Sequence, residues 1–129
     1  MTSNRYRLES MPRAQCHVSI QRRSLKDVEA CLISYETLVL VAQGTPDGGV
    51  RLLCSGTYST TTARHINRFT KEFFGRNLYH SCKRAKSKSD LQFELVDEYT
   101  FTSAEAERFR ATVKRYESGE HTRRYYGNY

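Results

Sequence analysis

The sequence predicts an α+β fold in which a small antiparallel sheet of about four strands carries two amphipathic helices on one face. Three observations lead to this prediction: short β-rich or alternating runs, two longer segments with apolar residues at helical spacing, and a cap signal before each of those segments. No repeat and no linker divides the 129 residues. We therefore expect a single domain over residues 16–119, between a flexible lead-in at 1–15 and a basic, aromatic tail at 120–129.

Four segments carry the pattern of strands. Residues 16–21 alternate apolar and polar side chains, which predicts a half-buried strand. Residues 31–42 are rich in Leu, Val, Ile, Tyr and Thr, which predicts the longest strand. The sequence GTPDGG at 44–49 predicts a turn, so residues 50–54 return as the second strand of a hairpin. Residues 91–96 alternate again and predict a further strand.

The first predicted helix begins near the four hydroxyl residues at 59–62, because such side chains accept hydrogen bonds from the free N–H groups of a helix start. Gly75 is the residue type that ends helices. Between them, five apolar residues fall on one helical stripe: Ala63, Ile66, Phe69, Phe73 and Phe74.

The second predicted helix has a capping-box signature, in which Thr102 stands three residues before Glu105. Four apolar residues then recur on one stripe: Ala106, Phe109, Val113 and Tyr116. The segment from Glu117 to Gly119 ends this helix.

The charge of the chain is concentrated in one segment. The formal net charge is +7, and residues 61–90 contain eight Lys and Arg against Glu72 and Asp90. This balance favours an anionic partner, either nucleic acid (DNA or RNA) or an acidic or nucleic-acid-binding host protein. The alternative is that the charge serves solubility alone.

We assign the candidate nucleic-acid-binding residues to two parts of this segment. One part is a helix face away from the apolar stripe, and the other is a segment that we interpret as a basic loop over residues 76–90. The candidates are Arg64, Arg68, Lys71, Arg76, Lys83, Arg84, Lys86 and Lys88. The alternative for the helix is a solvated face with hydroxyls that serve only as caps, and for the loop a solvated surface.

Other chemistry has little support in the sequence. The cysteines Cys16, Cys31, Cys54 and Cys82 form no C-x-x-C pair, so we expect no metal site and no cofactor. No nucleophile-centred motif or phosphate loop is present, so we expect no enzymatic activity. The longest apolar stretch, 38–42, is too short for a bilayer, and we expect a cytoplasmic protein with reduced thiols and no membrane partner.

One stretch resembles a known pattern. Residues 34–37 (SYET) and 58–69 (YSTTTARHINRF) are similar to small phage- and mobile-element-encoded proteins in which an S-Y-x-T strand precedes a Y-S-x-T-T-x-x-H-I-N helix start. Thr62 departs from the pattern, where Ser is frequent. The resemblance covers residues 31–74, implies a phage or mobile-element origin, and implies no reaction. It makes six positions the ones to test: Tyr35, Thr37, Tyr58, Thr61, His65 and Asn67.

His65 has two interpretations. It belongs to the resembling motif, yet on a helical wheel it lies near Glu72 and away from the basic face, as a structural hydrogen-bonding residue would.

The charge pattern thus predicts a protein that binds nucleic acid non-specifically through phosphate contacts, and the resemblance implies an accessory protein of a phage or mobile element. The aromatic and basic tail contains side chains that can stack on bases, or else has no role. The alternative function is a protein-binding inhibitor of a host defence complex, similar in action to anti-CRISPR proteins, or a virion component.

Overall fold

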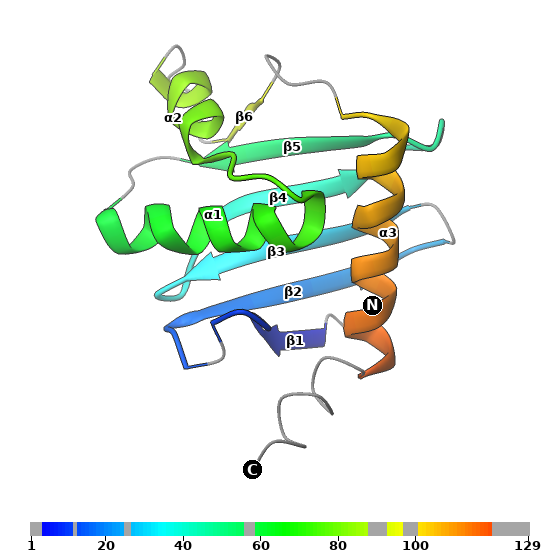
Figure 1. Cartoon of the computed structure of the whole chain (residues 1–129), viewed down its shortest axis with the longest axis horizontal. Coiled ribbons are helices and arrows are strands. Elements are labelled where there is room, and N and C mark those ends of the chain that lie inside the picture. The colour runs from blue at the N-terminus through cyan, green and yellow to red at the C-terminus, as the bar shows by residue number, and fades with distance from the viewer. Residues whose placement is uncertain are drawn as a thin grey trace.

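The computed structural model describes residues 4–11, 13–24, 27–55, 59–87, 93–96 and 101–119. In these residues one six-stranded antiparallel sheet runs in sequence order from β1 to β6, with three helices (Figure 1). The strands are β1 Asn4–Arg7, β2 Cys16–Arg22, β3 Val28–Ser34, β4 Thr37–Gly44, β5 Val50–Ser55 and β6 Phe93–Leu95. The helices are α1 Thr60–Phe74, α2 Tyr79–Ser87 and α3 Ser103–Ser118. The predicted α+β fold around an antiparallel sheet is confirmed, with more strands and one more helix than expected.

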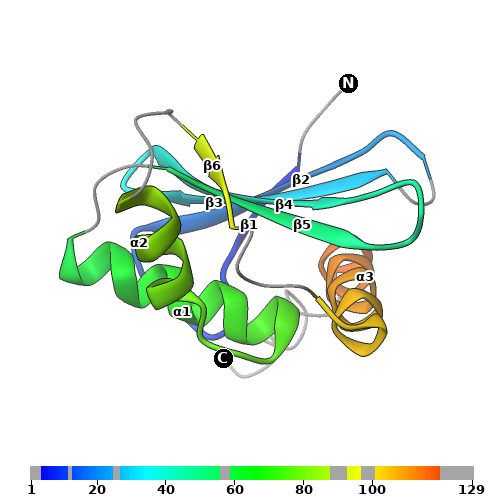
Figure 2. The ribbon, with the colours of Figure 1, turned by 90° about the horizontal axis from the view of Figure 1, so that it is seen from above.

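All three helices cover the same face of the sheet (Figure 2). Burial alternates strictly along β3 because one side of the strand faces the helices and the other faces solvent. Thus Ala30 and Leu32 are fully buried, whereas Cys31 and Ile33, which alternate with them, are only half-buried. The core is the layer between the sheet and the helices.

α1 forms as the sequence predicts. Ser59 caps it, its Oγ accepting from Thr62 N at 3.1 Å, and Gly75 ends it in the left-handed conformation with φ 86°. Four of the five predicted core residues are buried: Ile66, Phe69, Phe73 and Phe74. Ala63 is half-buried and lies off this face, where Thr62 and His65 are buried instead.

α3 also agrees with the prediction. Thr102 and Glu105 form both hydrogen bonds of the capping box, and Gly119 ends the helix with φ 80°. The predicted stripe is buried, and its aromatic rings pack on α1. The ring of Phe73 lies 5.3 Å from that of Tyr116, centroid to centroid.

The prediction of one strand over residues 31–42 is wrong. Residues Tyr35 and Glu36 form a two-residue turn between β3 and β4, with φ of 49° and 67°. Positive φ at both central residues defines a type I′ hairpin turn, which is usually made by Asn-Gly. Because neither residue is Asn or Gly, the sequence offers no turn signal at this point.

The structure also differs from the predicted lead-in at residues 1–15. β1 pairs with β2 along its length, and Leu8 is fully buried. The ring of Tyr6 packs edge-on against Tyr116, with centroids 5.7 Å apart. A four-residue edge strand with two Arg gives too short a pattern for sequence analysis. The predicted tail at 120–129 lies outside the described residues.

The predicted basic loop over residues 76–90 contains a helix instead, α2. Its buried side is made by Cys82 and Ala85, and Leu78, just before its first residue, continues the same helical face. Two α1 side chains accept from its first N–H groups: Thr70 Oγ1 from Leu78 N and Asn67 Oδ1 from Tyr79 N, both at 3.1 Å. In the sequence this apolar stripe is short and stands among lysines and arginines, so the segment was predicted to be a loop.

None of α1, α2 and α3, the helices of the described residues, combines the length and the apolar character needed to cross a lipid bilayer.

Thr70→Val should destabilise the fold by about 1–3 kcal/mol, because it keeps the shape but leaves the buried Leu78 N–H without its acceptor. Urea unfolding measures the change. Thr60→Val, at an exposed site on the same helix, is the matched control and should stay within about 0.5 kcal/mol of wild type. Equal losses in the two variants would mean that helix propensity, and not the hydrogen bond, is responsible.

Candidate nucleic-acid interface

A hollow of about 500 Å³ runs along the outer face of α1, from its first turn to the link before α2. It is lined by Thr60, Ala63, Arg64, Asn67, Arg68, Lys71 and Asn77. We call this the α1 groove. Three of the eight predicted binding residues, Arg64, Arg68 and Lys71, therefore come together in one place.

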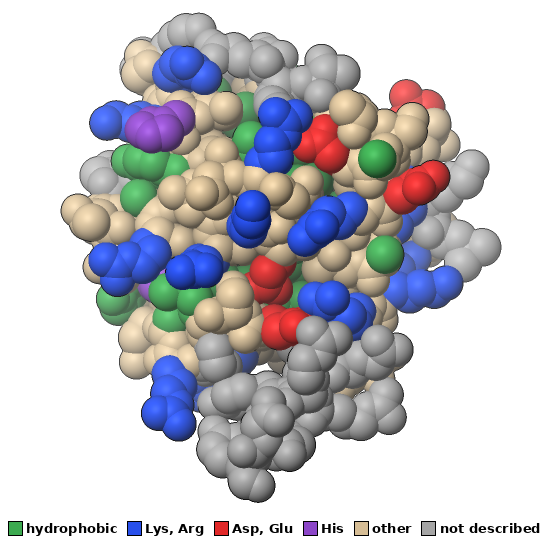
Figure 3. Space-filling view, viewed as in Figure 1, with side chains coloured by type: hydrophobic (Ala, Val, Ile, Leu, Met, Phe, Trp, Pro, Cys, Tyr) green, Lys and Arg blue, Asp and Glu red, His purple; other side chains and the backbone are tan. Residues whose placement is uncertain are grey.

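The helical period fixes this arrangement. Arg64, Arg68 and Lys71 stand at i, i+4 and i+7, so they share a face, and that face is opposite the buried one. All three side chains are exposed. Within the described ranges none of them forms an ion pair. Figure 3 shows Lys and Arg side chains along α1, with acidic side chains beside the C-terminal half of α1 and near α3.

The helix ends add to the positive potential. No acidic residue stands in the first turn of α1 or of α2, so nothing there neutralises the positive end of either helix dipole. Among the residues that the structure describes, no carboxylate lines the α1 groove. A groove with three cations and no anion attracts phosphate groups.

The other predicted binding residues do not join the groove. Arg76 Nε lies 3.0 Å from Glu105 Oε2, so it ties the end of α1 to the capping box of α3. Lys83, Arg84 and Lys86 lie on α2, the first two exposed and the third half-buried. Lys88 lies outside the described residues.

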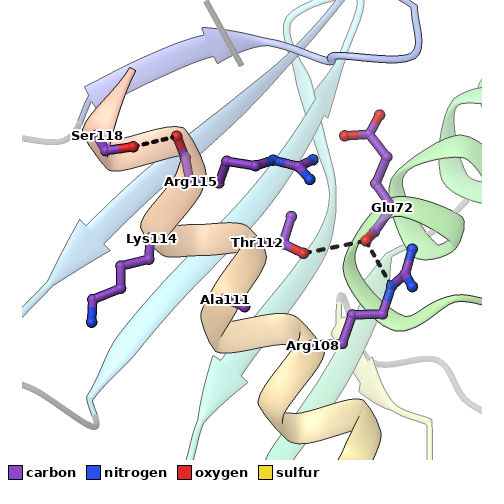
Figure 4. Close-up of a pocket in the computed structure, with 7 residues that line it drawn as sticks. All are labelled: Glu72, Arg108, Ala111, Thr112, Lys114, Arg115 and Ser118. Carbon is purple, nitrogen blue, oxygen red and sulfur yellow. Dashed lines mark hydrogen bonds between the residues drawn. The ribbon is translucent and has the colours of Figure 1, made fainter. Parts of the chain in front are cut away.

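A second hollow, of about 600 Å³, lies between α1 and α3 (Figure 4). Its lining includes Arg108, Lys114 and Arg115, which lie outside the segment 61–90 where the excess of positive charge is concentrated. Two of these cations have internal partners: Arg108 donates to the Glu72 and Lys71 carbonyls at 3.2 and 3.3 Å, and Arg115 pairs with Glu9 at 2.8 Å. This hollow also contains the Glu72 side chain, so it suits an anion less well than the α1 groove does.

At this second hollow, the Glu72 side chain connects three segments of the chain. Its carboxylate accepts from the Tyr116 hydroxyl and from Ser10 N and Oγ, and thereby joins α1, α3 and the segment after β1. Burial, and then the charge of Glu72, raise the pKa of Tyr116, so the phenol keeps the proton that it donates.

The motif residues form a buried polar contact between the β3–β4 hairpin and α1. Ser34 Oγ lies 2.9 Å from His65 Nδ1 and 3.1 Å from Thr62 Oγ1. All three side chains are at least nine-tenths buried. The structural interpretation of His65 thus agrees with its contacts. Ser34 was missed as the partner of His65, because this contact joins β3 to α1 across 31 positions of the chain.

The remaining motif residues have separate surroundings. Asn67 holds the start of α2 and also lines the α1 groove. Thr61 is half-buried on α1, and Thr37 is exposed at the start of β4. Tyr35 is exposed at the hairpin turn, and Tyr58 lies outside the described residues.

The four cysteines are free thiols. Burial raises the pKa of Cys16 to about 11 and that of Cys31 to about 12, so both stay protonated and unreactive near neutral pH. In the part of the chain that the structure describes, no three His, Cys, Asp or Glu side chains come together as metal ligands would.

The fold and the groove define an α+β protein with a one-sided helical layer and a basic helix face. The profile of a family described as a family of unknown function, DUF8033, matches residues 6–92, about two thirds of the chain. The chain therefore belongs to this family. The matched segment includes the β3–β4 hairpin, α1 and α2, and ends before α3. No curated protein and no solved structure matches the chain.

The stability of the fold should fall as pH falls below the ordinary His pKa of 6.5. Burial, and then the charge of Arg64, lower the pKa of His65, so the unfolded chain binds a proton that the folded protein resists. The His65 contribution to stability is therefore complete above pH 6.5 and is lost below it. His65→Gln should flatten this part of the pH profile, measured by urea unfolding between about pH 7 and 5. An unchanged profile would contradict the assignment, and His80→Gln, at an exposed His, is the control.

Arg76→Ala should lower stability by about 0.5–1 kcal/mol, since its partner Glu105 belongs to the α3 cap while the Arg side chain is 54% exposed. Any nucleic-acid affinity should change less than in an Arg68→Ala variant, because Arg76 lies outside the α1 groove. Thermal unfolding and binding of the two variants together test this. Equal losses of affinity would place Arg76 in the interface.

Proposed function

We propose that this protein binds nucleic acid without sequence preference, through phosphate contacts in the α1 groove. The observation that carries the proposal is the convergence of Arg64, Arg68 and Lys71 in a groove whose described lining residues include no carboxylate. Guanidinium and ammonium groups are the usual phosphate ligands of nucleic-acid-binding proteins. Contacts to phosphate position a protein on the strand and do not read its sequence.

α2 supplies a second set of contacts in this proposal. Lys83, Arg84 and Lys86 follow the groove in the chain, and α2 packs on α1 through Asn67 and Thr70. These hydrogen bonds hold α2 at a fixed position relative to α1, and in this proposal both basic helices contact one phosphate backbone. Arg76 is excluded from this set by its ion pair with Glu105.

We further propose that the protein is an accessory protein of a phage or mobile element. The support is the resemblance of residues 34–37 and 58–69 to such proteins. A basic face of this kind also fits an acidic or nucleic-acid-binding host protein, as an inhibitor of a host defence complex or a virion component would need. That reading is the outcome to consider if nucleic acid does not bind.

Replacing Arg64, Arg68 and Lys71 together with Ala should weaken nucleic-acid binding at low salt by at least about tenfold. The reason is the loss of three counterion-releasing contacts, so the slope of log K against log salt should also become shallower by between about 2 and 3 units. Fluorescence anisotropy with a labelled duplex and a labelled single strand, over a salt series, measures both quantities.

The matched control removes the same charge elsewhere. Arg5, Arg23 and Arg51 are exposed and lie outside the helical layer, in β1, after β2 and in β5. Their triple Ala variant should bind nearly as wild type does. If both triple variants lose affinity equally, net charge and not the groove is responsible. If wild type binds neither nucleic acid, the proposed function is wrong, and a nuclease-treated pull-down for a host protein follows.

A further inference from the structure

The turn between β3 and β4 displays an aromatic side chain that packing does not require. Tyr35 is 55% exposed, more than the other large apolar side chains on the described surface, Leu38 and Leu95 at 39% each. Its φ is 49°, and that of Glu36 is 67°. A type I′ turn prefers Asn-Gly at these positions, because other L-residues are strained at positive φ. Local stability alone would therefore select a different pair of residues.

Contacts of the backbone and of the ring hold Tyr35 in place. Its backbone N–H donates to the Gln15 carbonyl at 2.9 Å, which anchors the turn to the start of β2. Its ring lies 5.8 Å from that of His65, centroid to centroid, at 35°. Ser34, the preceding residue, is hydrogen-bonded to His65 Nδ1 at 2.9 Å. A ligand that packs on Tyr35 would thus meet an ordered surface and pay little conformational entropy.

This ring packs against His65, a residue of α1 that does not itself line the α1 groove. His65 is the chain neighbour of Arg64, and Arg68 lies three residues further along α1, where side chains are neighbours on a helix surface. Figure 1 shows the β3–β4 turn beside the N-terminal end of α1. An exposed aromatic side chain next to a cationic groove is the arrangement that binds unpaired nucleotides, because phosphates follow the groove while a base stacks on the ring.

We propose that Tyr35 stacks on an unpaired base of a single-stranded nucleic acid whose phosphates lie in the α1 groove. This inference rests on the proposed function and adds the kind of strand that is bound. In a duplex the base faces are covered by their neighbours, so only the phosphate contacts remain. Stacking tolerates any base, since each has a π face, which agrees with binding that does not depend on sequence.

The strain at the turn supports the same assignment. Residues held in disfavoured backbone conformations gather at binding sites, where stability is given up for function. Here the strained residue is also the exposed aromatic one, and the resembling motif includes it. A change that relieves the strain should therefore separate stability from binding.

The test compares affinities for a labelled single strand of about 12 nucleotides and for the duplex of the same sequence. Tyr35→Ala should weaken single-strand binding by roughly 5- to 100-fold and duplex binding by less than about twofold. Tyr35→Phe keeps the ring and should bind as wild type does. The double variant Tyr35→Asn/Glu36→Gly should raise the melting temperature by a few degrees and still lose single-strand affinity, which rules out misfolding as the cause.

The outcomes separate the two proposals. Wild type that binds, with an Arg64/Arg68/Lys71→Ala variant that does not, supports the groove. If Tyr35→Ala then leaves single-strand affinity unchanged, or weakens duplex and single strand equally, the stacking inference alone is overturned. If wild type binds neither strand form at any salt concentration, both proposals are overturned.

Discussion

The packing of one face of α1 against the sheet determines most of what this molecule presents to solvent. Ile66, Phe69 and Phe73 are fully buried, and they fix the rotation of the helix about its axis. Because a helix repeats every 3.6 residues, the same packing turns Arg64 and Arg68 outward. The α1 groove is thus a consequence of the core, and its cations need no contacts of their own to be placed.

Polar contacts, some of them buried, then attach the β3–β4 hairpin, α2, α3 and the segment after β1 to α1. Near its start, His65 meets Ser34 of the β3–β4 hairpin, and in its middle Asn67 and Thr70 hold α2. At its end, Glu72 joins α3 and the segment after β1. A buried polar group that loses its partner costs free energy, so these contacts fix positions that apolar packing alone would leave less defined.

The same contacts explain why the helical face is basic. Several carboxylates on this side have internal partners: Glu72 accepts from Tyr116, Glu9 pairs with Arg115, and Glu105 pairs with Arg76. Glu117 likewise pairs with Arg22. These four carboxylates therefore have partners of their own, while no described carboxylate lines the groove that holds Arg64, Arg68 and Lys71. The distribution of partners, and not only the net charge of +7, produces the positive surface.

The features that could be predicted from the sequence are those that depend on residues close together in the chain. The caps of α1 and α3 and the stripe of Phe69 and Phe73 were readable, because capping and helical spacing depend on neighbours in the chain. The turn at Tyr35 was not readable, because tertiary contacts hold a residue there that turn propensity disfavours. The groove cations were predicted from their spacing in the sequence. The ion pair between Arg76 and Glu105 could not be predicted in this way, because it depends on α3, which lies far along the chain.

The most direct test of the central claim is to map the amide chemical shifts of the protein while a short single-stranded oligonucleotide is added. The account predicts that the largest changes fall on residues 60–71 of α1 and on Tyr35, with little change at Ser19 and Leu53 on the open face of the sheet. Shifts confined to that open face, or none at saturating oligonucleotide, would contradict the assignment of the α1 groove as the binding site.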